Sequence, residues 1–252
     1  QVAAATRRGK IETNGWYRSM NIDAKYHPTP EQLEGFAQGT LSPGMNVVIS
    51  AHVELCAICR QSISELEEAA SEEWFRSTSD RKTSSINFSA MIDSIVDHPQ
   101  IKGDRTRADN VSEIHMLDHS VTLPRALAKV ASDGLVWRQL AGGINQATVT
   151  LDGQTQCEFL YMKPGSQVPV HKHQGNEVTL VLDGSFEDEL GHYKPGDFVV
   201  RTAKDLHQPA SEEGCLCFAV MDSPLTFTKG LARLLNPFIR YRFRRATSAA
   251  AH

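Results

Sequence analysis

Two groups of side chains in this sequence have the spacing of metal ligands. The first spans residues 27–59 and combines histidines with cysteines, whereas the second spans residues 171–207 and combines histidines with a glutamate. Thiolate-containing zinc sites are usually closed and stabilise a fold, while histidine–carboxylate sites often keep a place for water or substrate. The pair therefore predicts one region that a metal stabilises and another in which a metal meets small molecules.

The first group is His52-x-x-x-Cys56-x-x-Cys59. On a helix that turns about 100° per residue, these three side chains fall within an arc of about 60°. Imidazole and thiolate ligands suit Zn(II), which takes four ligands in structural sites. His27, just before the first predicted helix, supplies the fourth ligand. The sequence thus predicts a closed zinc site of two histidines and two cysteines.

Two other interpretations of this group remain open. In the first alternative no metal binds, Cys56 and Cys59 are unreactive core residues, and His52 is buried beside them. A redox-active dithiol is the second alternative, but such a motif normally follows a strand, and this one lies among predicted helices. Oxidation of zinc-bound thiolates would make the site redox-sensitive.

The second group follows the spacing of the first motif of the cupin family. That motif reads here Gly165-x5-His171-x-His173-x3-Glu177-x6-Gly184. On an extended strand His171 and His173 point to the same side, into the barrel, and His207 comes from a later strand. Three imidazoles and a carboxylate suit zinc first, with iron, manganese and nickel also open. A metal-free barrel is the alternative.

The second cupin motif is looser than the first. Three residues separate Gly191 from Pro195, and no asparagine follows His207. Because of this departure, the cupin motifs are weaker evidence for catalysis than for metal binding. His115, His119 and His192 have no evident ligand partners.

Composition points to an ordinary globular protein. The chain has 252 residues, of which 40% are hydrophobic and 22% charged, and the separation of the two ligand groups favours two domains. No apolar run reaches about 18 residues and no apolar signal core is present, which predicts a cytoplasmic protein without membrane association. An odd number of cysteines, five, argues against a disulfide framework and fits a reducing compartment.

Charge is distributed unevenly along the chain. Residues 20–97 contain 12 acidic and 5 basic side chains, whereas residues 229–245 contain six basic and no acidic ones. An acidic N-terminal region argues against direct nucleic-acid binding and favours a basic protein partner. A DNA-binding zinc finger is therefore the least favoured class of function. The basic tail is expected to be solvated.

Periodicity predicts a helical N-terminal part. Helices are expected from Thr29 to Gly39, from Pro43 through His52, and from Arg60 to Phe75, with Trp74 on the apolar face of the third. A fourth, amphipathic helix covers residues 88–96 and either packs within its own domain or docks onto a partner.

Beyond residue 120 the pattern changes to short strands separated by glycine, aspartate and proline turns, which predicts an antiparallel sandwich or barrel. The strands are expected at Gln146–Leu151, Cys157–Lys163, Glu177–Leu182, Asp197–Arg201 and Cys215–Met221. Cys157, Cys215 and Cys217 are expected in the core, with oxidation near the metal as the alternative. A helix-like stretch at 228–235 precedes the tail.

These patterns give a fold class of two domains: a small all-α zinc-binding helical domain followed by an all-β cupin, an antiparallel jelly-roll barrel. The predicted segments are an extension (1–19), the helical zinc domain (20–97), a linker (98–119), the cupin domain (120–228), and a helix with a basic tail (229–252).

The combination of the two motifs resembles the ChrR family of zinc-dependent anti-sigma factors. The resemblance covers the chain from about Met20 to the end of the cupin. It implies that one zinc site consists of His27, His52, Cys56 and Cys59, and that the cupin site consists of His171, His173, Glu177 and His207. It further implies that the N-terminal helices sequester an extracytoplasmic-function sigma factor, and that the cupin is needed to release it under singlet-oxygen or related oxidative stress.

The competing class is an enzyme. Cupins with three histidines and a glutamate include dioxygenases and isomerases, so a bound metal acting on a small molecule is the alternative function, with the zinc domain as a regulatory part. A homodimer is also left open by the sequence.

Overall fold

The structure is a computed structural model that describes residues 22–78, 88–98, 113–115, 120–151 and 153–248. The predicted extension (1–19) and most of the predicted linker, including His119, lie outside the described residues. Within the described part of the chain, no helix combines the length and the hydropathy that a membrane span requires.

Four helices form in the N-terminal part, as the periodicity predicts. They are α1 (Pro30–Ala37), α2 (Pro43–Leu55), α3 (Ala57–Thr78) and α4 (Phe88–Val96). Thr29 and Gln32 form a capping box at the start of α1, and Ser42 Oγ accepts a hydrogen bond from the Met45 amide at the start of α2. These side chains satisfy amide groups that have no partner within the helix, so the sequence places both helix starts locally.

One local prediction is wrong, because no single helix carries His52, Cys56 and Cys59. Helix α2 ends at Leu55, and Cys56 has extended backbone angles of φ −108° and ψ 114°. The Cys56 amide still donates to the carbonyl of His52 at 2.8 Å, after which the chain turns into α3. The three ligands therefore meet at a corner between two helices.

The rest of the chain is mainly an antiparallel β-barrel, which confirms the predicted fold class. The longer strands are β4 (Ile144–Val149), β5 (Gln156–Met162), β8 (Glu177–Gly184), β11 (Phe198–Arg201) and β14 (Cys215–Met221). The shorter ones are β3 (Arg138–Gln139), β6 (Ser166–Gln167), β7 (His171–His173), β9 (Phe186–Asp188), β10 (Gly191–Tyr193), β12 (Leu206–His207), β13 (Ala210–Ser211) and β15 (Leu225–Phe227). The barrel sheets have the orders β11-β8-β14-β5-β4-β3, β10-β9-β13-β6 and β12-β7-β15.

Several elements were not expected. Strand β1 (Glu113–His115) pairs with β2 (Ser120–Thr122), so part of the segment predicted as linker is a strand. Helix α5 (Arg125–Ala131) was not predicted, because it is too short to show a clear hydrophobic periodicity in the sequence. The division into domains stays a prediction.

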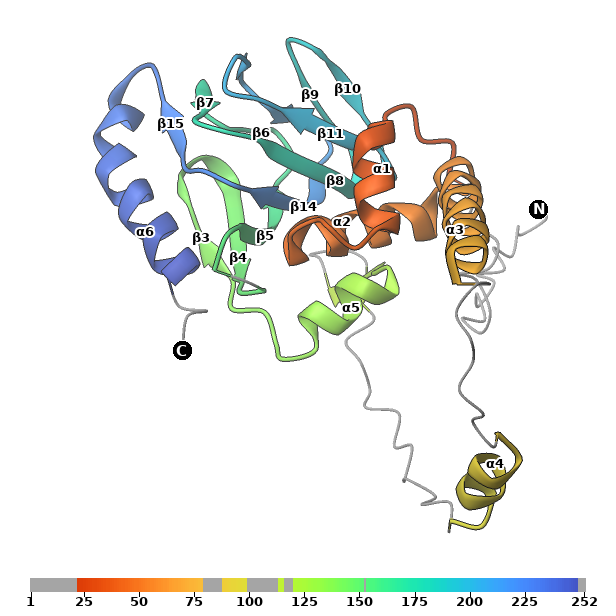
Figure 1. Ribbon diagram of the computed structural model, residues 1–252. Helices are drawn as coiled ribbons and strands as arrows, with labels where there is room; N and C mark the ends of the chain where they lie inside the picture. The colour runs from red at the N-terminus through yellow and green to blue at the C-terminus, as the bar shows by residue number, and fades with distance from the viewer. Residues whose placement is uncertain (1–21, 79–87, 99–112, 116–119, 152, 249–252) are drawn as a thin grey trace, which may run out of the picture.

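The basic tail is helical, and most of its basic side chains are exposed, as expected. A 3-10 turn at Leu231–Leu235 leads into α6 (Asn236–Ser248). Helix α6 lies on the side of the barrel opposite to α1 and α3 (Figure 1). The Arg242 guanidinium donates to Gln146 Oε1 at 2.8 Å, so at least one basic side chain of the tail is anchored to the barrel.

The helices and the barrel share one hydrophobic core. Val48 and Ile49 of α2 belong to the same buried cluster as Leu127 of α5 and the barrel residues Phe159 and Phe218. A second cluster fills the inner face of the barrel and includes Val181, Val199 and the two cysteines of β14. The helical part is therefore not separately packed, and Cys56 and Cys59 belong to the core that it shares with the barrel.

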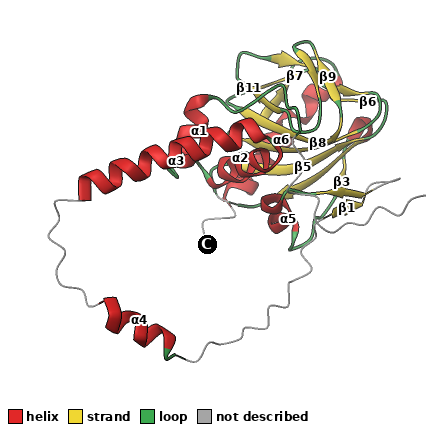
Figure 2. Cartoon of the chain, turned by 90° about the vertical axis from the view of Figure 1, so that its right-hand side faces the viewer, coloured by secondary structure: helices red, strands yellow, loops and turns green. Residues whose placement is uncertain are grey.

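Only the first part of α3 follows the expected burial. Ile63 is buried, but Trp74, predicted on the inner face, is 61% exposed because the C-terminal half of α3 extends beyond the barrel (Figure 2). Helix α4 has no buried residue and is drawn apart from the barrel in Figure 2.

Candidate metal centres

The four residues predicted as the first ligand set come together in space. The ligand atoms of His27, His52, Cys56 and Cys59 all lie within 4.8 Å of one another. His52 Nε2 lies 3.3 Å from Cys59 Sγ, and His27 Nδ1 lies 3.5 Å from each of the two sulfur atoms. Two imidazole nitrogens and two sulfurs facing a common point fit a tetrahedral cation. We call this group the thiolate centre.

His52 is fixed in the tautomer that a metal requires. Its Nδ1 lies 2.9 Å from the carbonyl oxygen of Gly196, and because a carbonyl only accepts hydrogen bonds, Nδ1 carries the proton. The Nε2 lone pair then faces the two cysteines. Burial, as the largest cause, lowers the pKa of His52 to about 4, so the ring is neutral at pH 7.

The Cys59 thiol is protonated at pH 7 as long as no cation lies beside it. Burial, together with the neighbouring Cys56, raises the pKa of Cys59 to about 12. A bound divalent cation would displace the proton of Cys59, because thiolate is the ligand form. Metal binding at the thiolate centre is therefore linked to proton release.

The second predicted ligand set also converges, inside the barrel. His171 and His173 lie on β7, Glu177 begins β8, and His207 on β12 pairs with His171. Their ligand atoms lie within 4.8 Å of one another and all four residues are buried. His173 Nε2 lies 3.2 Å from His207 Nε2 and 2.9 Å from Glu177 Oε2. We call this group the cupin centre.

The electrostatics of the cupin centre also suit a cation. Burial first, and then the neighbouring His207, lowers the pKa of His171 to about 4. Burial alone would raise the pKa of Glu177, but its interactions with His173 outweigh burial and hold that pKa at about 2. At pH 7 the centre therefore offers a neutral imidazole and an anionic carboxylate, which are the forms that bind metal.

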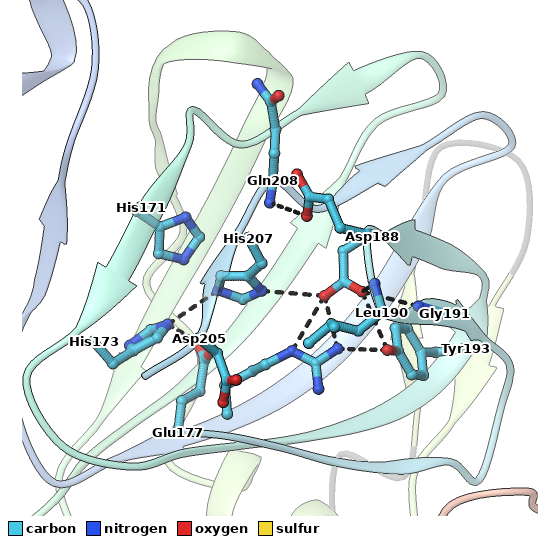
Figure 3. A network of polar contacts seen from close by, with 12 residues as sticks. His171, His173, Glu177, Asp188, Leu190, Gly191, Tyr193, Asp205, His207 and Gln208 are labelled. Atoms are coloured by element: carbon cyan, nitrogen blue, oxygen red, sulfur yellow. Dashed lines mark hydrogen bonds and ion pairs between the residues drawn. The ribbon is translucent and has the colours of Figure 1, made fainter. Parts of the chain in front are cut away.

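Outside the ligands, a polar network orients His207 (Figure 3). His207 Nδ1 lies 3.2 Å from Asp188 Oδ2, which also accepts a hydrogen bond from Arg201 at 2.7 Å. The Tyr193 hydroxyl donates to the other carboxylate oxygen of Asp188 at 3.1 Å. Such outer partners fix the tautomer and direction of a metal-binding imidazole. Similarly, His171 Nδ1 lies 3.0 Å from the carbonyl oxygen of Pro169.

Several of these residues were missed by reasoning from the sequence. Asp188, Tyr193 and Arg201 reach the cupin centre through tertiary contacts, and nothing in their spacing indicates it. Glu158 did leave a signal, as a single acidic residue in the otherwise apolar run of β5. It is buried beside Gln146 and Gln156, and burial is the largest cause that raises its pKa to about 7.

The remaining cysteines lie in the core, as expected. Cys157 is fully buried in the cluster shared with the helices. Cys215 and Cys217 are buried on the inner face of β14, with their sulfur atoms 3.3 Å apart. Among the described residues, neither these cysteines nor His115 and His192 belong to a group that could hold a metal.

Comparison with known proteins agrees with this geometry. Residues 126–223 match the family model described as the ChrR cupin-like domain. The chain is 31% identical to the anti-sigma-E factor ChrR of Cereibacter sphaeroides over 218 residues. This alignment covers 86% of this chain and 98% of that protein. This chain belongs to the ChrR family of anti-sigma factors. The named relative is a regulatory protein rather than an enzyme.

A solved structure of the family has the same fold. The chain matches the crystal structure of Rhodobacter sphaeroides SigE in complex with the anti-sigma ChrR with a TM-score of 0.59 and 25% sequence identity. The match covers 79% of this chain and 99% of the matched chain, so it includes both the helical region and the barrel.

Proposed function

We propose that this protein is a cytoplasmic anti-sigma factor that sequesters an extracytoplasmic-function sigma factor and releases it under oxidative stress. The observation that carries the proposal is the 31% identity to an anti-sigma factor over 98% of that protein's length. The two convergent ligand groups add support, because the match spans the helical region and the barrel that carry them.

The helical part is the proposed sigma-binding region. Helix α4 exposes five apolar side chains on one face, with exposed fractions from 48% for Met91 to 68% for Val96. A contiguous exposed apolar face on a soluble protein is typical of a binding surface. The acidic side chains of α3 lie nearby in the chain and suit a partner with a basic, nucleic-acid-binding surface.

Zinc is the proposed metal of both centres. The ligand set of the thiolate centre suits zinc in a closed structural site. For the cupin centre zinc is proposed first, although iron, manganese and nickel accept the same ligands. When bound there, the metal supplies a Lewis-acidic position at which an oxidant can act, and the chain orients the imidazoles around it.

Release is proposed to start at the cupin centre. An oxidant that alters its ligands or its metal would have to change the helical region, because the sigma-binding surface lies there. The shared core gives a physical basis for such a change. The resulting interface with the sigma factor is expected to be large, on the order of 2,000 Å² or more, so that it competes with polymerase.

The proposal is tested by co-expressing the full chain with tagged extracytoplasmic-function sigma factors and measuring capture and metal content. Wild type should form a 1:1 complex, and Ile92→Asp on the apolar face of α4 should weaken it by roughly tenfold or more. Ser94→Asp places the same charge on the polar face and should leave binding unchanged. If no sigma factor is captured, the proposed anti-sigma function is wrong. If Ile92→Asp binds like wild type, the proposed binding surface is wrong.

A second measurement tests the signal. Singlet oxygen or peroxide should dissociate the wild-type complex, while His171→Ala, which removes a ligand from the cupin centre, should keep the complex intact. Equal release from both proteins would refute the cupin centre as sensor without affecting the anti-sigma assignment.

A further inference from the structure

We propose that the barrel turn Lys194–Asp197 and the side chain of Tyr193 position the ligands of the thiolate centre, so that the two metal centres are energetically coupled. The inference rests on the proposed occupation of both centres by metal. It deepens the proposed function, because it names the residues through which a change at the cupin centre reaches the helices.

The turn contacts His52 directly and also contacts the backbone immediately before His27. The carbonyl oxygen of Gly196 accepts from Nδ1 of His52 at 2.9 Å. Asp197 Oδ1 accepts from the backbone amides of Lys25 and Tyr26 at 2.6 and 3.1 Å, immediately before His27. Both imidazoles therefore take their position from the barrel as well as from the helices.

The same turn is firmly held in the barrel. Asp197 is buried, and its Oδ2 accepts from the Lys194 amide at 2.8 Å. Gly196 N donates to Val181 O at 2.8 Å, and Val181 N donates to Asp197 O at 3.1 Å. Gly196 has a φ of +90°, and a Cβ there would lie 2.8 Å from Cγ2 of Ile22, so only glycine fits. The turn therefore moves together with β8, the strand that begins with Glu177.

A second set of contacts runs from Tyr26 to a ligand of the cupin centre. The rings of Tyr26 and Tyr193 pack with their centroids 5.0 Å apart. The Tyr193 hydroxyl donates to Asp188 at 3.1 Å, and Asp188 in turn lies 3.2 Å from Nδ1 of His207 (Figure 3). Each step is a direct contact between buried or half-buried groups.

These contacts predict reciprocal coupling. A metal at the cupin centre fixes His207, and through Asp188 and Tyr193 it fixes the segment that precedes His27. Loss of an outer partner of a metal ligand typically costs about 10- to 100-fold in metal affinity. Coupling between two binding sites is symmetric, so each metal strengthens the binding of the other by the same factor.

The test uses Co(II) as the probe and the full chain without any sigma factor. Only the thiolate centre contains sulfur, so its sulfur-to-cobalt charge-transfer band reports that centre alone. The Co(II) affinity of the thiolate centre is measured in wild type and in His171→Ala, which removes a cupin ligand outside the proposed contact path. We expect an affinity about 10-fold weaker in His171→Ala.

The contact path is then interrupted by Tyr193→Phe and by Asp197→Asn, separately. In the Tyr193→Phe or the Asp197→Asn protein, adding His171→Ala should change the logarithm of the thiolate-centre affinity by less than about half of the change that it causes in the wild-type protein. Glu213→Gln is the matched control, because Glu213 Oε1 accepts from the Ser185 hydroxyl at 2.7 Å and takes part in none of the contacts described above. In the Glu213→Gln background the full effect of His171→Ala should remain.

Equal affinities in wild type and His171→Ala, with the band present, would overturn the coupling. So would a Glu213→Gln control that abolishes the effect as well, since this would indicate general loosening of the barrel. Should Asp197→Asn fail to fold, Tyr193→Phe decides, because it keeps the ring contact and removes only the hydroxyl. A wild-type protein without the band would instead refute the metal assignment of the proposed function.

Discussion

Asp188 Oδ2 accepts a hydrogen bond from Nδ1 of His207 at 3.2 Å, inside the barrel and away from the metal-facing nitrogen of the ring. This contact directs Nε2 of His207 toward the other ligands of the cupin centre, 3.2 Å from Nε2 of His173. The carboxylate is itself fixed by Arg201, whose interactions together with His207 outweigh burial and hold the pKa of Asp188 well below its usual range.

Asp188→Asn should therefore weaken zinc binding at the cupin centre by about 10- to 100-fold. The variant keeps the size of the side chain but loses the negative charge that orients His207. Competition with a chromophoric chelator measures the affinity. Asp133→Asn, at an exposed position after α5, is the control and should bind zinc like wild type.

Glu158 predicts a specific dependence of stability on pH in the metal-free protein. Its folded-state pKa is about 7, raised mainly by burial from the ordinary value of 4.5. Between these values the folded state holds a proton that the unfolded state releases, so the free energy of unfolding falls as the pH rises through this window. The loss is on the order of 3 kcal/mol, from about 1.4 kcal/mol per pKa unit.

Glu158→Gln should remove most of this loss, because the amide has no proton to release. Urea unfolding of the metal-free variant and wild type at about pH 5 and about pH 8 measures the difference. Glu187→Gln, on the exposed side of β9, should behave like wild type. An identical pH dependence in wild type and Glu158→Gln would contradict the prediction.

The close packing around Gly44 predicts that the contact between α2 and the barrel leaves no room for an added methyl group. A Cβ at this position would lie 2.6 Å from Thr155 Oγ1 and 2.7 Å from Cys157 Sγ. Gly44→Ala should lower the free energy of unfolding by about 1–3 kcal/mol through overpacking, despite the better helix propensity of alanine. Thermal unfolding measures the change.

The double variant Gly44→Ala/Cys157→Ala tests the cause. Removing the sulfur relieves one of the two overlaps of the added methyl group, so the double variant should be more stable than the sum of the two single changes predicts. Strict additivity would show that the overlap with Cys157 is not the source of the destabilisation.

The capping box of α1 predicts a smaller, local effect. Thr29 accepts from the Gln32 amide at 3.3 Å, and the Gln32 side chain accepts from the Thr29 amide at 2.9 Å. Thr29→Ala should cost about 1 kcal/mol, whereas Thr29→Ser should cost less because it keeps the hydroxyl. Chemical denaturation of both variants checks the ranking.

Much of the local structure was predictable from the sequence because its causes are local. The helix starts at Pro30 and Pro43 follow from capping residues directly before them. The in-facing pair His171 and His173 follows from the two-residue period of a strand, and both are buried. The composition of each ligand group followed from spacing and from a resemblance to a family whose members share it.

Other features were decided only by contacts between residues distant in the chain. Cys56 leaves the helix, α5 forms against α2, and α6 places Arg242 beside Gln146, none of which local periodicity encodes. Their physical cause is packing on a shared core, which overrides weak local propensity.

The sequence by itself determined which side chains form the two candidate ligand sets and what ligand chemistry each set offers, because ligand type and short-range spacing are properties of the chain. Only the tertiary structure decided that residues of the barrel support the ligands of the thiolate centre. His52 and Gly196 are 144 positions apart, and no pattern in the sequence pairs an imidazole with a particular carbonyl oxygen. That pairing exists because the helices close one face of the barrel, where a buried N–H must find an acceptor.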